Sequence, residues 1–170
     1  GHLFGLGHSA LGETEVISGG RRVIAAEAVM FPIAFSPGTT SGRAPRADDT
    51  AGLSQLYPES GAEESTGTIS GRVTREGAGV LGAHVVAFNP KTGTLVGGFN
   101  VNADGRFVIG RLEPGTYILR AEPIDDADLD SFFDDATGID VDFRVTYHEG
   151  LVIVPKGGGA PEVEIKVVSK

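Results

Sequence analysis

The feature that most restricts the fold is a succession of short apolar stretches, separated by turn residues, that begins near Thr68. Within them apolar and polar residues alternate or form brief valine and isoleucine runs, which is typical of strands with a buried face. Turns are expected at 91–93, at 102–105, which we interpret as a hairpin turn, and at 113–115. About seven short strands with regular turns predict an all-β sandwich over 68–170. The expected strands are 68–74, 83–89, 94–101, 106–109 and 116–122, followed by two or three more within 142–148, 151–154 and 163–168.

The turn and strand motifs of this region follow a recognisable order. They read G-x-I-S-G-x-V, then G-A-x-V-x-A, then T-G, then D-G-x-F, then L-x-P-G-x-Y. This order closely resembles the carboxypeptidase regulatory-like domain, a transthyretin-like β-sandwich. The resemblance implies a fold and no catalytic residues, because each glycine or proline stands where a turn needs it. Domains of this kind commonly accompany secreted enzymes as stabilising or binding modules.

The chain before this region has a different character. Residues 58–67 read P-E-S-G-A-E-E-S-T-G, a short acidic stretch that we interpret as a linker. The resulting domain boundaries are 1–57, 58–67 and 68–170. Residues 10–28 have no clear period and contain three glycines, so we expect a long loop there.

Two histidines lie six residues apart at the start of the sequence, with a glycine midway between them. We expect His2 on the last turn of a helix and Gly5 at its end with a positive φ, so that the reversed chain carries His8 back toward the same metal ion. The chain contains no cysteine, so a zinc site must use histidine and carboxylate ligands. His2 and His8 are therefore the candidate ligands of Zn²⁺.

This stretch resembles the end of the extended zinc motif of the metzincin endopeptidases, H-E-x-x-H-x-x-G-x-x-H, and is most similar to that of the matrixin branch. The resemblance implies an α/β fold for residues 1–57: the C-terminal, loop-rich subdomain of the catalytic domain, with short helices. It places the first histidine ligand and the catalytic glutamate three and two residues before Gly1. We therefore expect an N-terminally truncated part of a longer protein.

Two later strings carry the same resemblance. Met30, the only methionine, stands in V-M-F-P with Pro32 and is similar to the Met-turn that lies beneath the zinc-binding histidines. The string R-A-D-D-T-A-G-L-S-Q-L-Y-P is similar to the closing helix of matrixin catalytic domains, whose acidic pair, here Asp48 and Asp49, ties the helix to the Met-turn. An isolated methionine is also typical of a protein core. Two aspartates are also typical of the start of a helix, where negative charge is favoured. On physical grounds the second string is a short helix with Leu53, Leu56 and Tyr57 on one face.

Charge and hydropathy exclude some partners. The net charge is −9 and basic residues do not cluster, so nucleic acid is not expected as a partner. No apolar run approaches the roughly 20 residues of a membrane-spanning helix. The ligand of the β-sandwich is not defined by its residues, and a secreted, extracellular location is expected from the family resemblance alone.

Eight aspartates between residues 125 and 142 raise the question of Ca²⁺ binding. The run D-A-D-L-D resembles the start of an EF-hand, but Ser131 stands where that loop needs glycine and Thr137 where it needs glutamate. We therefore reject an EF-hand. A looser calcium site stays open beside a solvated acidic loop anchored by Phe132 and Phe133. We interpret His84 and His148 as structural or surface histidines on strands.

The resemblance implies a zinc-dependent endopeptidase that hydrolyses protein or peptide substrates with metal-activated water. The residues present supply two ligands and no general base, so this fragment is expected to be inactive while the parent protein is active. The alternative is a non-enzymatic secreted binding or adhesion protein whose β-sandwich grips a polymer or a protein. Coincidental spacing in an intracellular domain is a further interpretation.

Overall fold

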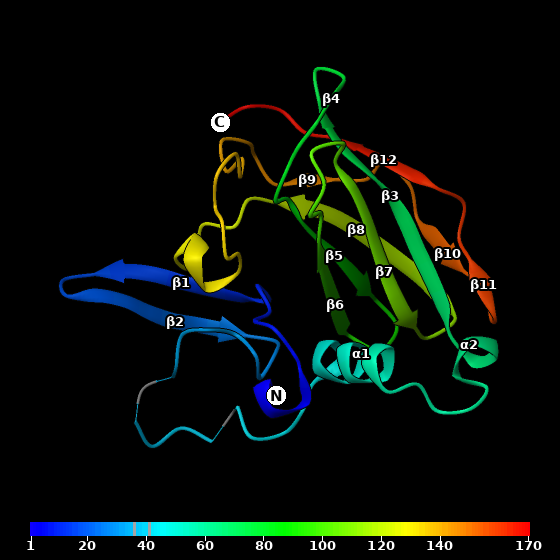
Figure 1. Ribbon diagram of the computed structural model, residues 1–170, viewed down its shortest axis with the longest axis horizontal. Helices are drawn as coiled ribbons and strands as arrows, with labels where there is room; N and C mark the ends of the chain where they lie inside the picture. Colours follow the sequence, from blue (N-terminus) through cyan, green and yellow to red (C-terminus); the bar gives the residue numbers. More distant parts are fainter. Residues whose placement is uncertain (36, 41) are drawn as a thin grey trace.

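The computed structural model describes residues 1–35, 37–40 and 42–170. It is mostly β-sheet with few helices, and two five-stranded sheets form a β-sandwich (Figure 1). The first sheet has the order β10-β8-β5-β6, with β9 beside β8, and its pairings are antiparallel. Its strands are β5 (His84–Asn89), β6 (Thr94–Phe99), β8 (Gly115–Glu122), β9 (Thr146–Tyr147) and β10 (Val152–Val154).

The second sheet is built around β3 (Gly67–Arg75), which pairs with every other strand in it. It pairs antiparallel with β4 and β7 but parallel with β11 and β12, so this sheet is mixed. The other strands are β4 (Ala78–Gly79), β7 (Arg106–Leu112), β11 (Gly158–Gly159) and β12 (Val163–Lys166). The sandwich predicted over 68–170 is thus present, with ten strands among the described residues where about seven were expected.

Alternation of side chains explains how the two sheets share one core. In β3 the odd-numbered residues from 67 to 73 are buried and the even-numbered ones are partly exposed, as a strand with one covered face requires. Ile69 and Val73 meet Val85, Leu119 and residues of β7 in a single buried cluster. Burial of this apolar face against the opposite sheet is the main stabilising contribution to the sandwich.

The turn at 102–105 differs from the prediction. Gly105 has a φ of 77° and donates its N–H to the carbonyl of Asn102 over 2.9 Å, so a tight turn forms there. However, β6 pairs with β5 whereas β7 pairs with β3, so the turn crosses from one sheet to the other and does not close a hairpin. The turn at 91–93 does join a hairpin, β5 to β6, with Gly93 at a φ of 74°.

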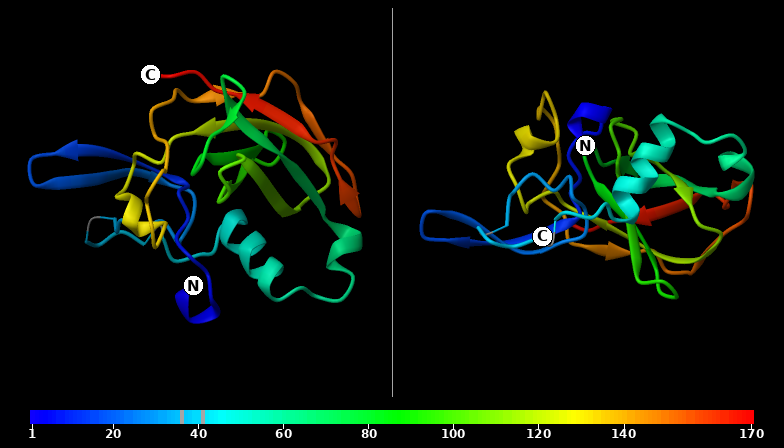
Figure 2. Two further views of the ribbon diagram at one scale, coloured as in Figure 1. Left: turned by 45° about the horizontal axis from the view of Figure 1, so that its top comes forward. Right: turned by 90° about the horizontal axis from the view of Figure 1, so that it is seen from below.

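The first 57 residues were expected to contain a long loop at 10–28, and this prediction is wrong. A two-stranded antiparallel hairpin stands there, made of β1 (Gly12–Ile17) and β2 (Gly20–Ala26). It projects away from the sandwich in both views of Figure 2. Two of the three glycines that suggested a loop serve the hairpin's connection, because Gly19 has a φ of 102° and Gly20 a φ of 145°.

The remaining elements are short helices. A single 3₁₀ turn, η1 (His2–Phe4), opens the chain, and η2 (Leu129–Ser131) lies between β8 and β9. The expected helix is α1 (Ala47–Leu56), but its buried residues are Asp49 and Ala51. Leu56 and Tyr57, predicted to share a packed face, are exposed. The expected linker at 58–67 contains one helical turn, α2 (Ala62–Ser65).

The N-terminal residues pack directly on the sandwich. Val86 of β5 points to the outer face of its sheet, where Leu11 and Ala28 cover it in a second buried cluster. Helix α1 packs against β6 and β7, and its Ala51 belongs to the main core cluster. This packing explains why β5 is buried on both faces, and it brings the start of the chain against the sandwich.

Candidate metal centre

His2 and His8 converge at the start of the chain. Gly5 ends η1 with a φ of 83°, as predicted, and donates its N–H to the carbonyl of His2 over 3.0 Å. A side chain at this φ is strained, so glycine suits the reversal. The returning chain brings Nε2 of His8 to 3.1 Å from Nε2 of His2, with the ring centroids 4.8 Å apart.

The hydrogen-bond partners of the two Nδ1 atoms determine whether each Nε2 atom carries a hydrogen or a lone pair. Nδ1 of His2 lies 2.9 Å from the carbonyl oxygen of Leu6, and Nδ1 of His8 lies 2.5 Å from that of Ser131. A carbonyl oxygen only accepts hydrogen bonds, so each Nδ1 must carry its hydrogen. In a neutral imidazole the lone pair is then on Nε2. When both rings are neutral, two Nε2 lone pairs therefore lie 3.1 Å apart.

Two lone pairs at this distance repel unless a proton or a metal cation lies between them. Nitrogens bound to one zinc ion at about 2.05 Å, with a tetrahedral angle between the bonds, are about 3.3 Å apart. The observed 3.1 Å is close to that separation. The pair thus fits two ligands of a tetrahedral metal ion.

Met30 contacts the residues that flank this pair. Its side chain is buried, and its sulfur packs so closely on Gly1 that a Cβ on that glycine would overlap the sulfur. The carbonyl of Met30 also accepts the N–H of Ser9 over 3.0 Å. The residues flanking both histidines therefore rest on Met30, and Pro32 follows in a partly buried position.

Asp49 joins α1 to the Met30 segment. Its side chain is 5% exposed, and its carboxylate accepts the N–H groups of Val29 at 3.0 Å and Met30 at 3.2 Å. The same carboxylate accepts the N–H of Arg46 at the helix start, over 2.8 Å. A carboxylate in the first turn of a helix is favoured by the unpaired N–H groups there.

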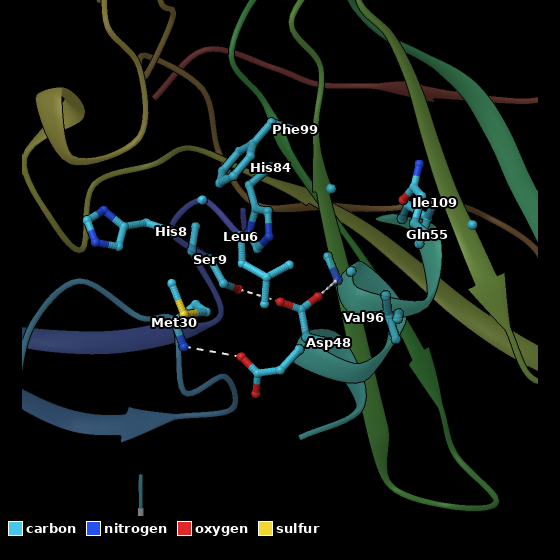
Figure 3. A pocket seen from close by; sticks show the side chains of 18 of the residues that line it. Leu6, His8, Ser9, Met30, Asp48, Gln55, His84, Val96, Phe99 and Ile109 are labelled. Carbon is cyan, nitrogen blue, oxygen red and sulfur yellow. Dashed lines mark hydrogen bonds between the residues drawn. The ribbon is translucent and has the colours of Figure 1, made fainter. Parts of the chain in front are cut away.

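Asp48 faces the other way, toward the sandwich. Its carboxylate accepts the hydroxyl of Ser9 over 2.6 Å and the N–H of Gly97 in β6 over 2.8 Å (Figure 3). Burial raises the pKa of Asp48 above its ordinary value; the nearby charge of Asp49 adds to this effect, and the two hydrogen bonds and the charge of His84 oppose it without cancelling it.

His8 lines a cavity of about 210 Å³ between the N-terminal segment, α1 and the sandwich. Ser9, Met30 and Asp48 line one side, and Val96, Phe99 and Ile109 of the sandwich line the other (Figure 3). The site is therefore bordered by both parts of the chain.

His84 also lines this cavity, although its sequence context indicated only a structural or surface histidine. It stands opposite Phe99 of β6 and Glu122 of β8 in the strand register, so the three side chains share one face. Its Nδ1 lies 2.9 Å from a Glu122 carboxylate oxygen, and Nε of Arg120 donates to the other oxygen over 2.6 Å. Burial acts to raise the pKa of Glu122, but the hydrogen bonds and charges of His84 and Arg120 outweigh burial and lower it.

The aspartates of 125–142 are dispersed. Asp126 accepts the N–H of Thr14 over 2.7 Å, Asp140 pairs with Arg75, and Asp125 lies 3.0 Å from Nζ of Lys170. Within the described ranges, no three histidine, cysteine, aspartate or glutamate side chains are grouped so that they could hold a metal ion. His148 lies elsewhere, with Nδ1 3.3 Å from the carbonyl of Glu164.

Residues 68–125 match the family model of the carboxypeptidase regulatory-like domain, in agreement with the resemblance seen in the sequence. No curated protein matches the chain. The matched range begins after residue 67, so the metzincin resemblance of residues 1–57 rests on those residues themselves. In the part of the chain that the structure describes, no helix is long and apolar enough to cross a membrane.

Proposed function

We propose that His2 and His8 are two ligands of a zinc ion and that the protein is a zinc-dependent endopeptidase. The observation that carries the proposal is the 3.1 Å approach of two Nε2 atoms, each in a ring whose Nδ1 lies within hydrogen-bond distance of a carbonyl oxygen. The matrixin resemblance supplies the third histidine ligand and a glutamate general base from residues that precede Gly1. The same resemblance supports a secreted protein.

The chemistry divides between the ion and the residues present. Zinc with one open coordination position polarises a peptide carbonyl and lowers the pKa of a bound water. His2 and His8 hold the ion, and the carbonyls of Leu6 and Ser131 keep their Nε2 lone pairs available. Met30 contacts the residues that flank the two histidines, and Asp49 holds the backbone of Met30. None of these residues is positioned as the general base, so residues 1–170 alone are expected to hydrolyse no peptide bonds.

The test is hydrolysis of casein by the whole protein and by the 170-residue chain. The whole protein should cleave casein, lose this activity with a zinc chelator and regain it with added zinc. His8→Ala in the whole protein should remove the activity, whereas His148→Ala, which changes a histidine outside the site, should retain it. A whole protein that neither contains zinc nor cleaves casein would contradict the proposal. Robust cleavage by the 170-residue chain would contradict the inference that residues 1–170 contain two zinc ligands and no general base.

The second candidate is a non-enzymatic secreted binding or adhesion protein. The match of residues 68–125 to a domain family whose resemblance implies no catalytic residues favours it. In that case the histidine pair would hold a metal ion or a shared proton with no hydrolytic role. Zinc binding without casein cleavage in the whole protein would support this second candidate.

A further inference from the structure

The connection between β8 and β9 reaches from the sandwich to the histidine pair. We call residues 123–145 the acidic loop; it contains η2 and most of the aspartates discussed above. At the end of η2 the carbonyl oxygen of Ser131 accepts Nδ1–H of His8 over 2.5 Å. The two residues are 123 positions apart in the sequence, so this contact exists only because the sandwich is folded against the N-terminal segment.

The two histidines obtain their carbonyl acceptors differently. The acceptor of His2 is Leu6, four residues later in the same reversal of the chain, so it forms with local structure alone. The acceptor of His8 belongs to the acidic loop of the sandwich. The orientation of His8 therefore depends on where that loop is held.

Two anchors hold the loop in place. On the sandwich side, Phe132 and Phe133 both pack on Phe99 of β6, each with ring centroids 5.6 Å from it. On the side of the N-terminal hairpin, Asp126 accepts the N–H of Thr14, and its backbone carbonyl accepts the Thr14 hydroxyl over 2.8 Å. These two bonds join the acidic loop to β1. The carbonyl of Ser131 is thus fixed from both sides.

A fixed carbonyl beside one ring nitrogen decides the tautomer and the direction of the other nitrogen. Metal-binding histidines ordinarily donate their second N–H to such an acceptor, and loss of the acceptor typically weakens metal binding by about 10- to 100-fold. We infer that the acidic loop of the β-sandwich is a positioning element for His8, which it holds with the Nε2 lone pair directed at the metal ion. The inference rests on the proposed zinc site, and it assigns the sandwich a part in that site.

The test releases the sandwich anchor and reads the state of His8 directly. In the chain carrying Phe132→Ala and Phe133→Ala, we expect zinc affinity to fall by about 10- to 100-fold. In the metal-free protein, in mildly alkaline buffer, ¹⁵N–¹H correlation spectra should show His8 changing from the Nδ1–H tautomer to a mixture of tautomers. Replacement of both phenylalanines by leucine keeps an apolar anchor and should restore both readouts. Tyr147→Ala removes an exposed aromatic ring from β9 and should alter neither.

The outcomes separate this inference from the proposed function. Equal zinc affinity and an unchanged His8 tautomer in the double alanine variant would overturn the positioning role. Absence of zinc binding in the unaltered chain would instead overturn the proposed function, while the tautomer spectra still decide whether the loop orients His8. If the double variant does not retain the thermal unfolding of the sandwich, Asp126→Ala combined with Thr14→Ala removes the contacts of both side chains at the other anchor and must shift the same spectra.

Discussion

The carboxylate of Asp48 accepts the backbone N–H of Gly97 over 2.8 Å, so the first turn of α1 is bonded to the middle of β6. The glycine allows this close arrangement, since a Cβ there would overlap Nε2 of His84. Because Asp48 also accepts the hydroxyl of Ser9, next to His8, a single carboxylate connects the histidine pair's segment, the helix and the sandwich.

The first prediction concerns the pH dependence of this carboxylate. Burial raises the pKa of Asp48 in the folded protein above its ordinary value of 3.8. The ionised form therefore costs stability above the raised pKa, and this cost disappears as the pH falls toward 3.8. In urea unfolding, the stability of the unaltered chain relative to Asp48→Asn should rise over this interval as the pH is lowered. A relative stability that falls on acidification would contradict the assigned shift.

Glu122 should show the opposite sign. Its folded pKa is lower than the ordinary 4.5 because the contacts with His84 and Arg120 outweigh burial. Its contribution to stability is then present above about pH 4.5 and is lost as the pH falls through the lower folded pKa. The advantage of the unaltered chain over Glu122→Gln in urea unfolding should therefore shrink below pH 4.5. An advantage that grows on acidification would show that burial prevails.

Asp49→Ala should destabilise the chain by about 3 kcal/mol, because it leaves the N–H groups of Val29, Met30 and Arg46 without their acceptor. The free energy of unfolding in urea measures this effect. Asp134→Ala removes an exposed aspartate and serves as the matched control, with an expected change within about 0.5 kcal/mol. Equal effects of the two substitutions would refute the structural role of Asp49.

Gly71→Ala tests the pairing of β3 with β12. A Cβ at this position would overlap the carbonyl oxygen of Val163 and lie 3.0 Å from the ring of Phe107. We expect the free energy of unfolding to fall by about 3 kcal/mol as the two strands are forced apart. Gly110→Ala is the control, because its Cβ would meet nothing closer than the Thr68 hydroxyl at 3.9 Å. Thermal unfolding of the two variants compares them, and a tolerated Gly71→Ala would count against the observed register.

The parts of the fold that depend on local pattern are those that the sequence predicts. Alternation along 68–74 and the glycine at 93 correspond to β3 and to the hairpin between β5 and β6. The sheet crossing at 102–105 has the same turn residues as a hairpin, because the turn chemistry does not specify which sheet the next strand joins. That choice depends on which faces of β6 and β7 meet the core.

The hairpin at 12–26 was missed for a related reason. Its strands carry charged residues such as Glu13, Glu15, Arg21 and Arg22, and it projects from the sandwich, so no steady alternation marks a buried face. Ser18 and Gly19 between the strands are the available signal of a two-residue turn.

At the candidate site, the spacing of His2, Gly5 and His8 predicted a reversal that brings the two histidines together, and the structure contains it. The acceptors of the two Nδ1 atoms are backbone carbonyls, which every residue carries, so no side-chain pattern indicates them. Ser131 in particular reaches His8 only through tertiary packing over 123 positions.

The most direct test of the central claim is a zinc titration of the 170-residue chain by calorimetry. A second titration with cobalt, followed by absorption spectroscopy, observes the coordination of the ion. The account predicts one ion per chain, with binding lost in His2→Ala and in His8→Ala and retained in His148→Ala. Binding that is equally strong in all four proteins, or absent from the unaltered chain, would contradict a metal ion shared by His2 and His8.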